Sequence, residues 1–283
     1  MLNQSTDTVL RAMKLTGMAN ELERQNADPK LVAALSFDER LSLIVDAEWR
    51  KRQASKMKRY VNAACLPIRR AQVEDIEYHP DRKLDKAKIT QLSTCSYIDL
   101  GLHIIIHGAS GNGKTYLGCA LGNAACRRFK KTFYIRMQEL LERLTFEKAH
   151  GDYRKYLNSL KKLDLLIIDE FLLRLLTPEE ASHLLEVVEV RSRNDDGTSG
   201  RSTIFCTQYE ACDWYGRISP DSSEQNPETE AIIDRIVHTA HVIAVEGKYS
   251  MRQRHGLDAP KEPFGVAAEA APEATEGGSH EEN

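Results

Sequence analysis

The chain of 283 residues has 41% hydrophobic and 29% charged residues and a formal net charge of −3, values typical of a globular protein with room for one α/β core and a smaller module. No apolar run approaches the about 18 residues of a membrane-spanning helix, and the first residues lack the basic and then apolar pattern of a secretory signal. The six cysteines form no Cys-x-x-Cys pair, which argues against a zinc site and predicts reduced thiols in a cytoplasmic protein.

Residues 5 to about 65 are predicted to be helical. In the first part, apolar and small residues recur at spacings of one helix face: Leu10, Met13, Gly17, Met18 and Leu22. A second helix is predicted to begin at a capping box, in which the side chains of Ser36 and Glu39 satisfy N–H groups at the helix end. It continues with an apolar stripe of Leu41, Ile44, Val45 and Trp49. We therefore predict a small all-helical N-terminal domain over residues 1–70 and a connector over residues 71–98.

Basic residues are concentrated near the end of this helical region. Eight bases and no acid occur in 21 residues: Arg50, Lys51, Arg52, Lys56, Lys58, Arg59, Arg69 and Arg70. Such a run is commonly a solvated helix face. Because the run contains no acid and includes Tyr60, it also fits contacts with the phosphate backbone of DNA, which would be salt-dependent and independent of sequence. At this level both interpretations stay open.

Strands and helices alternate from Leu100 onward, which predicts an α/β domain over residues 99–257 with a mostly parallel sheet covered on both faces. The predicted strands are 103–106, 132–135, 165–168, 202–206 and 241–245, and the predicted helices are 114–129, 137–162 with a break near Gly151, 178–193 and 229–238. Residues 258–283 contain seven acids and one lysine and are rich in Ala, Glu, Pro and Gly, a composition that predicts disorder.

A glycine-rich loop follows the first predicted strand. Gly108-x-x-x-x-Gly113-Lys114-Thr115 matches the Walker A pattern and opens a predicted helix, which is the context that this motif requires. Glycines let the backbone curl until N–H groups point at phosphate oxygens, and the helix N-terminus adds positive potential. We expect Lys114 to reach the β- and γ-phosphates of ATP and Thr115 to bind Mg²⁺. The predicted nucleotide-binding residues are Gly108, Ala109, Ser110, Gly111, Asn112, Gly113, Lys114, Thr115 and Tyr116.

Two acids follow the apolar strand predicted at 165–168. Asp169 is expected to hold Mg²⁺ through water, as a Walker B acid does, and Glu170 to polarise an attacking water. Taken alone, Glu170 would be interpreted as a solvated charge at a strand end. Beside a Walker A loop, the pair of acids favours ATP hydrolysis over transfer of phosphate to a small molecule.

Two further polar positions are candidates for the same site. Thr207 and Gln208 end the strand predicted at 202–206, where a polar side chain can sense the γ-phosphate or simply begin a turn. Arg235 lies on a predicted helix and is either an arginine finger that reaches a neighbouring subunit or a surface ion pair with Asp234 or Glu230. The histidines have no spacing typical of metal ligands.

The sequence resembles the AAA+ ATPases of the IstB/DnaC clade. The loop GASGNGKT at 108–115, with its extra middle glycine, resembles their Walker A loop. Four other pieces resemble IstB-like transposition helper ATPases: LSFDERL at 35–41, DAEW at 46–49, IIDRIVH at 232–238 and GKYSMR at 247–252. The similarity extends from about residue 10 to residue 254.

The resemblance implies a fold, partners and roles beyond those that spacing predicts. It implies a helical N-terminal domain that contacts DNA and the transposase of the same element, followed by an AAA+ core at 99–257. It implies that Thr207 and Gln208 are sensor 1 and that Arg235 is an arginine finger in a homo-oligomer with composite ATP sites. ATP binding would drive assembly on duplex DNA, largely without sequence preference, and hydrolysis to ADP and phosphate would regulate the transposase. Little chain follows Arg252, which argues against a sensor 2 role for it.

Two other functions are compatible with the motifs. One is a DnaC-type replicative helicase loader that binds single-stranded DNA, against which the segment 46–49 argues. The other is a small-molecule P-loop kinase, against which Glu170 and the basic helical region argue.

Overall fold

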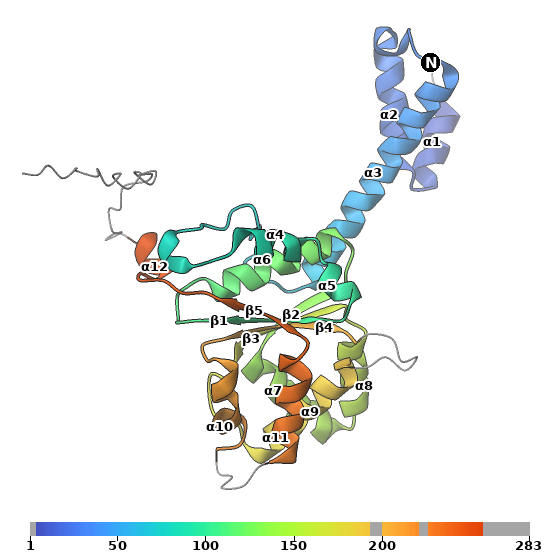
Figure 1. Ribbon diagram of the computed structural model, residues 1–283. Coiled ribbons are helices and arrows are strands. Elements are labelled where there is room, and N and C mark those ends of the chain that lie inside the picture. The colour runs from blue at the N-terminus through green and yellow to red at the C-terminus, as the bar shows by residue number, and fades with distance from the viewer. Residues whose placement is uncertain (1–3, 193–199, 221–225, 257–283) are drawn as a thin grey trace, which may run out of the picture.

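The computed structural model describes residues 4–192, 200–220 and 226–256, and its centre is a parallel sheet (Figure 1). The strands are β1 (His103–His107), β2 (Thr132–Arg136), β3 (Leu165–Phe171), β4 (Ser202–Thr207) and β5 (Ala240–Ala244), in the spatial order β2-β3-β4-β1-β5. Every neighbouring pair in this sheet is parallel. The prediction of an α/β fold with a mostly parallel sheet is confirmed.

Helices cover both faces of the sheet and enclose two apolar cores (Figure 1). One face carries α4 (Lys86–Ser93), α5 (Ser96–Asp99) and α6 (Lys114–Arg127); the other carries α7 (Met137–His150), α8 (Tyr153–Lys161), α9 (Pro178–Ser192), α10 (Trp214–Ile218) and α11 (Pro227–Val237). Ile104 and Ile106 of β1 lie in the first core and Ile105 lies in the second. This division follows from strand geometry, since successive side chains point to opposite faces.

The N-terminal helices stand apart from the sheet on a long helical stalk (Figure 1). They are α1 (Gln4–Ala12), α2 (Thr16–Ala27), the 3₁₀ turn η1 (Pro29–Val32) and α3 (Phe37–Ala63). The capping box predicted at the start of α3 is present, because Ser36 Oγ accepts from Glu39 N and Glu39 Oε2 accepts from Ser36 N. The N-terminal half of α3 packs on α2, and its C-terminal end reaches α6 and β2. One helix therefore connects the two parts of the molecule.

The contact between α2 and α3 depends on a glycine and a buried carboxylate. Glu48 Oε2 accepts a hydrogen bond from Gly17 N at 2.7 Å. A Cβ on Gly17 would lie 2.7 Å from the Glu48 Cα, so only glycine permits this approach of the two helices. Arg52 donates to the other oxygen of Glu48 at 2.8 Å and holds the pKa of that carboxyl below its usual value.

One expectation for the helical region is wrong in detail. The apolar positions expected to share one helix face are divided between α1 and α2 by a turn, in which Lys14 has a φ of +61°. Of the apolar stripe on α3, Ile44 is buried, but Leu41, Val45 and Trp49 are exposed, Trp49 at 61%. Periodicity indicates that residues share a face, whereas a core also requires an element that packs against that face.

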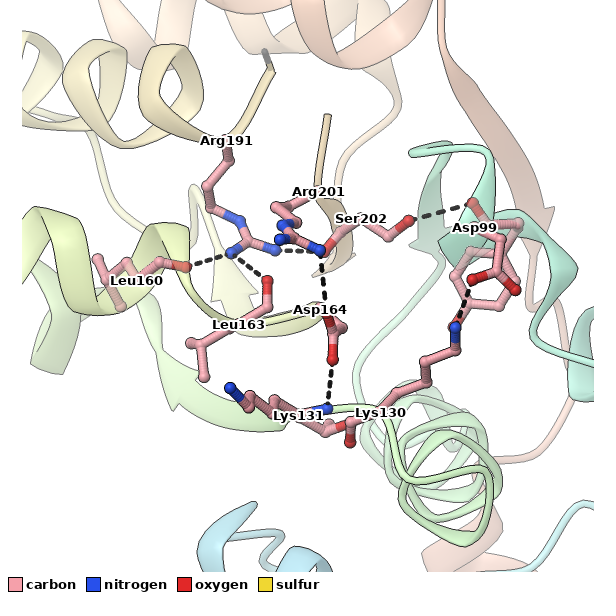
Figure 2. A network of polar contacts seen from close by, with 11 residues as sticks. Asp99, Lys130, Lys131, Leu160, Leu163, Asp164, Arg191, Arg201 and Ser202 are labelled. Carbon is pink, nitrogen blue, oxygen red and sulfur yellow. Dashed lines mark hydrogen bonds and ion pairs between the residues drawn. The ribbon is translucent and has the colours of Figure 1, made fainter. Parts of the chain in front are cut away.

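A network of polar contacts joins the amino ends of β3 and β4 to the helices beside them (Figure 2). The buried guanidinium of Arg191, at the end of α9, donates to the carbonyl oxygens of Leu160, Leu163 and Ser202. Burial lowers the pKa of Arg191 to about 9. Asp164 accepts from Arg201 at 3.0 Å and from Lys131 N at 2.8 Å. These contacts fix the edge of the sheet opposite the glycine-rich loop.

The remaining elements are short. They are η2 (Pro80–Arg82), η3 (Ala211–Asp213) and α12 (Met251–Arg254), which follows β5. The predicted disordered tail at 258–283 lies outside the described residues, and the predicted domain boundaries stay predictions.

Candidate nucleotide site

The glycine-rich loop connects the end of β1 to the first turn of α6. Gly108, Gly111 and Gly113 have φ angles of +148°, +83° and +91°, a backbone region that residues other than glycine rarely adopt. A Cβ on Gly108 would lie 2.1 Å from the carbonyl oxygen of Val245, so the loop also needs glycine for space. The loop therefore ends at the N-terminus of a 14-residue helix, where backbone N–H groups favour an anion.

Lys114 and Thr115 begin this helix at the bottom of a cleft. The Lys114 Nζ donates to the carbonyl oxygens of Gly108 and Ala109, each at 2.8 Å. Burial lowers the pKa of Lys114. Thr115 Oγ1 donates to Asp169 Oδ2 at 2.7 Å. A hydroxyl and a carboxylate in contact beside a phosphate loop are the ligands that P-loop proteins offer to Mg²⁺, so the donor set fits that ion.

The carboxylate of Asp169 accepts three hydrogen bonds. Besides Thr115, the Tyr134 hydroxyl donates to its Oδ2 at 2.7 Å, and the backbone N–H of Glu170 donates to its Oδ1 at 2.9 Å. Burial and this bond to Asp169 raise the pKa of Tyr134. Tyr134 was not predicted as a site residue. Its position follows from the sheet, since β2 lies next to β3 and Arg136 pairs in register with Asp169.

Glu170 lies at an irregularity of β3. The pairing of β3 with β4 shifts register between Ile168 and Phe171, and Glu170 has a φ of +55°. Such a bulge redirects a side chain that would otherwise follow the alternation of the strand. Glu170 is exposed and lines the cleft together with Asp169. The Tyr134 hydroxyl and the negative charge of Glu170 raise the pKa of Arg136, so a cation stands near this acid.

Most of the residues predicted for the nucleotide site line this one cleft. They are Ser110, Gly111, Gly113, Lys114, Thr115, Tyr116, Asp169, Glu170, Thr207 and Gln208. The cleft has a volume of about 280 Å³. Gly108, Ala109 and Asn112 line a neighbouring hollow instead, and Gln208 lines both. The amide of Asn112 points away from the cleft and donates to the Val245 carbonyl at 3.1 Å.

Thr207 and Gln208 meet the glycine loop because β4 pairs with β1. Thr207 stands opposite His107 in the register of these strands. The buried Thr207 Oγ1 accepts from Tyr209 N at 3.2 Å, whereas Gln208 is exposed. Of the two, Gln208 therefore has the freer side chain for contact with a ligand.

Arg235 does not line this cleft. It lies on α11, where its guanidinium donates to the Ala231 carbonyl at 3.1 Å and to Glu189 of α9 at 3.2 Å. The ion-pair partner expected from sequence was Asp234 or Glu230, and this expectation is wrong. Glu189 is 46 residues away in the chain and comes near because α9 packs on α11.

The basic residues at 50–70 lie on α3 and just beyond it. All except Lys56 are exposed. Lys56 is half-buried, with its Nζ 4.5 Å from the centre of the Phe129 ring. Arg52 is engaged by Glu48, as described above. The other six therefore present their charge to the solvent.

Sequence analysis missed a second pocket that opens beside the first. Both pockets share Gly113, Tyr116 and Met251. The second has a volume of about 270 Å³ and an apolar wall of Ile76, Leu84, Leu117 and Met251, with Asp75, Glu77, Arg82 and His255 around it. No local motif marks this combination of positions, since they come from the connector, from Leu117 of α6 and from the segment 251–255. Arg252, also on α12, lines the first cleft.

The strand order, the glycine loop after β1 and the two acids at the end of β3 define a P-loop nucleotide-binding protein of the AAA+ class. The chain belongs to the family of IstB-like ATP binding proteins, whose model matches residues 8–259. The predicted membership is confirmed.

Individual proteins agree with this assignment. The chain is 36% identical over 208 residues to the insertion sequence IS1162 ATP-binding protein of Pseudomonas fluorescens. The aligned residues cover 74% of this chain and 87% of that protein. The chain is 33% identical over 257 residues to an insertion-sequence ATP-binding protein of Sinorhizobium fredii, with coverage of 90% and 98%. The crystal structure of the DnaC helicase loader superposes with a TM-score of 0.50 at 18% identity, covering 67% of this chain and 99% of that chain. This last likeness concerns the fold alone.

Two features are absent from the described residues. Within them, no helix is long and apolar enough to cross a membrane. Within the same ranges, no three His, Cys, Asp or Glu side chains are grouped to hold a metal ion.

Proposed function

We propose that this protein is an Mg²⁺-dependent ATPase that assembles on DNA and assists the transposase of an insertion sequence. Hydrolysis is supported most strongly by one observation: the bulge in β3 directs Glu170 into the cleft that Lys114, Thr115 and Asp169 also line. The relatives named as insertion-sequence ATP-binding proteins support the biological setting.

In this proposal each residue of the cleft has one task. Lys114 leaves the carbonyl oxygens of its own loop and binds the β- and γ-phosphates. Thr115 and Asp169 hold Mg²⁺, which neutralises charge on the phosphates when bound. Glu170 accepts a proton from the attacking water, and Gln208, supported by Thr207, contacts the γ-phosphate.

The second pocket fits the base and ribose of ATP. Its apolar side chains Ile76, Leu84, Leu117 and Met251 offer a surface on which a flat aromatic base can pack. It adjoins the glycine loop through Gly113 and Tyr116, so one nucleotide can span both pockets. The connector at 71–98 would then be part of the nucleotide site.

Arg235 is assigned to a neighbouring subunit of a homo-oligomer. Within its own chain it is bound to Glu189 and lies outside the cleft. Both side chains of this pair are partly exposed, 36% and 48%, so the pair contributes little stability. Its exchange for a γ-phosphate of the next subunit is therefore energetically accessible.

The basic residues of α3 are assigned to the phosphate backbone of duplex DNA. The variant Lys51→Gln/Lys58→Gln/Arg59→Gln replaces three exposed bases. We expect weaker DNA binding at all sequences and a salt slope smaller by about one for each lost phosphate contact. Titrations of fluorescent DNA duplexes at several salt concentrations measure both.

The control for this experiment exchanges three exposed bases near α8: Arg154→Gln/Lys155→Gln/Lys162→Gln. It changes the net charge by the same amount, and its DNA binding should keep the salt dependence of the wild-type protein. An unaltered salt slope in the α3 variant would show that those bases form a solvated helix face and do not contact DNA.

The exposed apolar side chains of α3 are assigned to the transposase. Phe37, Leu41, Val45 and Trp49 follow one another at four-residue spacing, and Phe37 is 76% exposed. We expect Leu41→Ser/Trp49→Ser to lower capture of the transposase by at least about tenfold, because buried aromatic residues dominate interfaces. ATP affinity should not change. Purified transposase on a biosensor surface measures the first quantity.

This measurement also separates the two partner hypotheses. Phe146→Ser, which removes an exposed phenylalanine of α7, is the matched control and should bind transposase normally. Binding of a replicative helicase with no binding of transposase would favour the DnaC-type loader.

A further inference from the structure

Arg217, on α10, crosses to the loop that follows β3. Its Nε donates to the Leu172 carbonyl at 2.5 Å, and its Nη2 donates to the Leu173 carbonyl at 2.7 Å. The carbonyl of Arg217 itself accepts from Leu176 N at 3.0 Å. One residue therefore makes three hydrogen bonds with the backbone of the segment 172–176.

The backbone of this segment needs such support. Glu170 and Leu172 both have a φ of +55°, which residues other than glycine keep only when the surroundings hold them there. A hydrogen bond from Leu173 N to the Glu170 carbonyl, at 3.1 Å, closes the turn. The side chain of Leu173 is 43% exposed, so packing anchors this part of the turn only weakly.

The other side of Arg217 contacts the strand end that carries the sensor residues. Its guanidinium lies 3.7 Å from the centre of the Tyr209 ring. Tyr209 follows Gln208 directly, and its N–H donates to the Thr207 hydroxyl at 3.2 Å. The Tyr209 carbonyl accepts from Trp214 Nε1 at 3.3 Å, which fixes the tyrosine backbone.

These contacts form an unbroken chain between the two parts of the site. It runs from Thr207 to Tyr209, from the Tyr209 ring to Arg217, and from Arg217 through Leu172 and Leu173 to Glu170. We propose that Arg217 is a positioning residue for ATP hydrolysis, which holds the carboxylate of Glu170 in its reactive orientation and ties it to the strand that senses the γ-phosphate. This inference rests on the proposed ATPase function.

The test compares Arg217→Met and Arg217→Lys in the full chain with DNA present. The methionine keeps the length of the side chain but removes every donor, so we expect kcat to fall at least tenfold. ATP affinity should stay within twofold, because Arg217 does not line the cleft. Lysine keeps a cation over Tyr209 and one donor, so it should recover part of kcat. Steady-state turnover and titration with a fluorescent ATP analogue separate kcat from binding.

The matched control is Arg174→Met. Arg174 belongs to the same loop but forms an ion pair with Glu180 and contacts neither Tyr209 nor the Glu170 turn in the bonds described above. It should turn over ATP within twofold of the wild-type protein.

A double variant decides whether Arg217 acts through Glu170. In single-turnover experiments on Glu170→Gln, adding Arg217→Met should cause no further loss, since the carboxylate that Arg217 positions is already gone. An equal loss in both backgrounds, normal kcat in Arg217→Met, or a parallel loss of ATP affinity would overturn the inference. If Glu170→Gln itself turned over normally, the proposed catalytic role of Glu170 would fail first, and the two failures are thus distinguishable.

Discussion

Lys114→Ala is expected to abolish ATP binding at ordinary nucleotide concentrations. The ammonium group lies at the bottom of the cleft, and in the proposed function it is the cation that binds the β- and γ-phosphates. Two charge-assisted hydrogen bonds of about 2 kcal/mol each correspond to a loss of affinity of several hundred-fold. Calorimetric titration with ATP measures this directly.

The control for this variant is Lys148→Ala. Lys148 is exposed on α7 and pairs with Glu179 at 3.0 Å, far from the glycine loop in the chain. It should bind ATP as the wild-type protein does. Undiminished affinity in Lys114→Ala would contradict the assignment of the glycine loop to phosphate.

Glu170→Gln is expected to bind ATP normally and to hydrolyse it at least about 100-fold more slowly. The exchange preserves shape and removes only the basic carboxylate, while the glycine loop and Lys114 are untouched. Because hydrolysis is then blocked after ATP binding, the variant should accumulate as a DNA-bound oligomer. Phosphate release and particle size on DNA are the two readouts.

Glu142→Gln serves as the control for this second variant. Glu142 is an exposed residue of α7 that accepts a hydrogen bond from Gln138. Its exchange should leave turnover unchanged. Normal phosphate release by Glu170→Gln would move the water-activating role to another residue.

The sequence predicts best what depends on local pattern. Short, mainly apolar segments place all five strands, and the spacing of Gly108, Gly113 and Lys114 marks the loop because a glycine-rich loop with that spacing before a helix curls around phosphate. The acids Asp169 and Glu170 follow from the same logic, since the carboxyl ends of parallel strands meet at one edge.

What the sequence could not predict depends on contacts between distant segments. The second pocket joins Ile76 and Leu84 of the connector to Met251 of α12, and no periodicity relates them. Glu189 pairs with Arg235 only because two helices pack together. The bulge at Glu170 and the three hydrogen bonds of Arg217 depend on the register of β3 with β4 and on the turn after it.

The apolar stripe of α3 shows a further limit of pattern. Leu41, Val45 and Trp49 have the spacing of a buried face, yet no part of the described chain covers them. Spacing indicates which residues share one face of a helix. It does not indicate which other surface packs against that face. The exposure of the stripe in the folded chain therefore makes it a candidate interface.

The proposed control of assembly on DNA by ATP is tested by measuring binding of the wild-type protein to duplex DNA with ATP, with ADP and without nucleotide. Particle size is read in the same samples. We expect large particles on DNA with ATP and small, weakly bound ones with ADP or no nucleotide. Equal DNA affinity and equal particle size in all three conditions would contradict it.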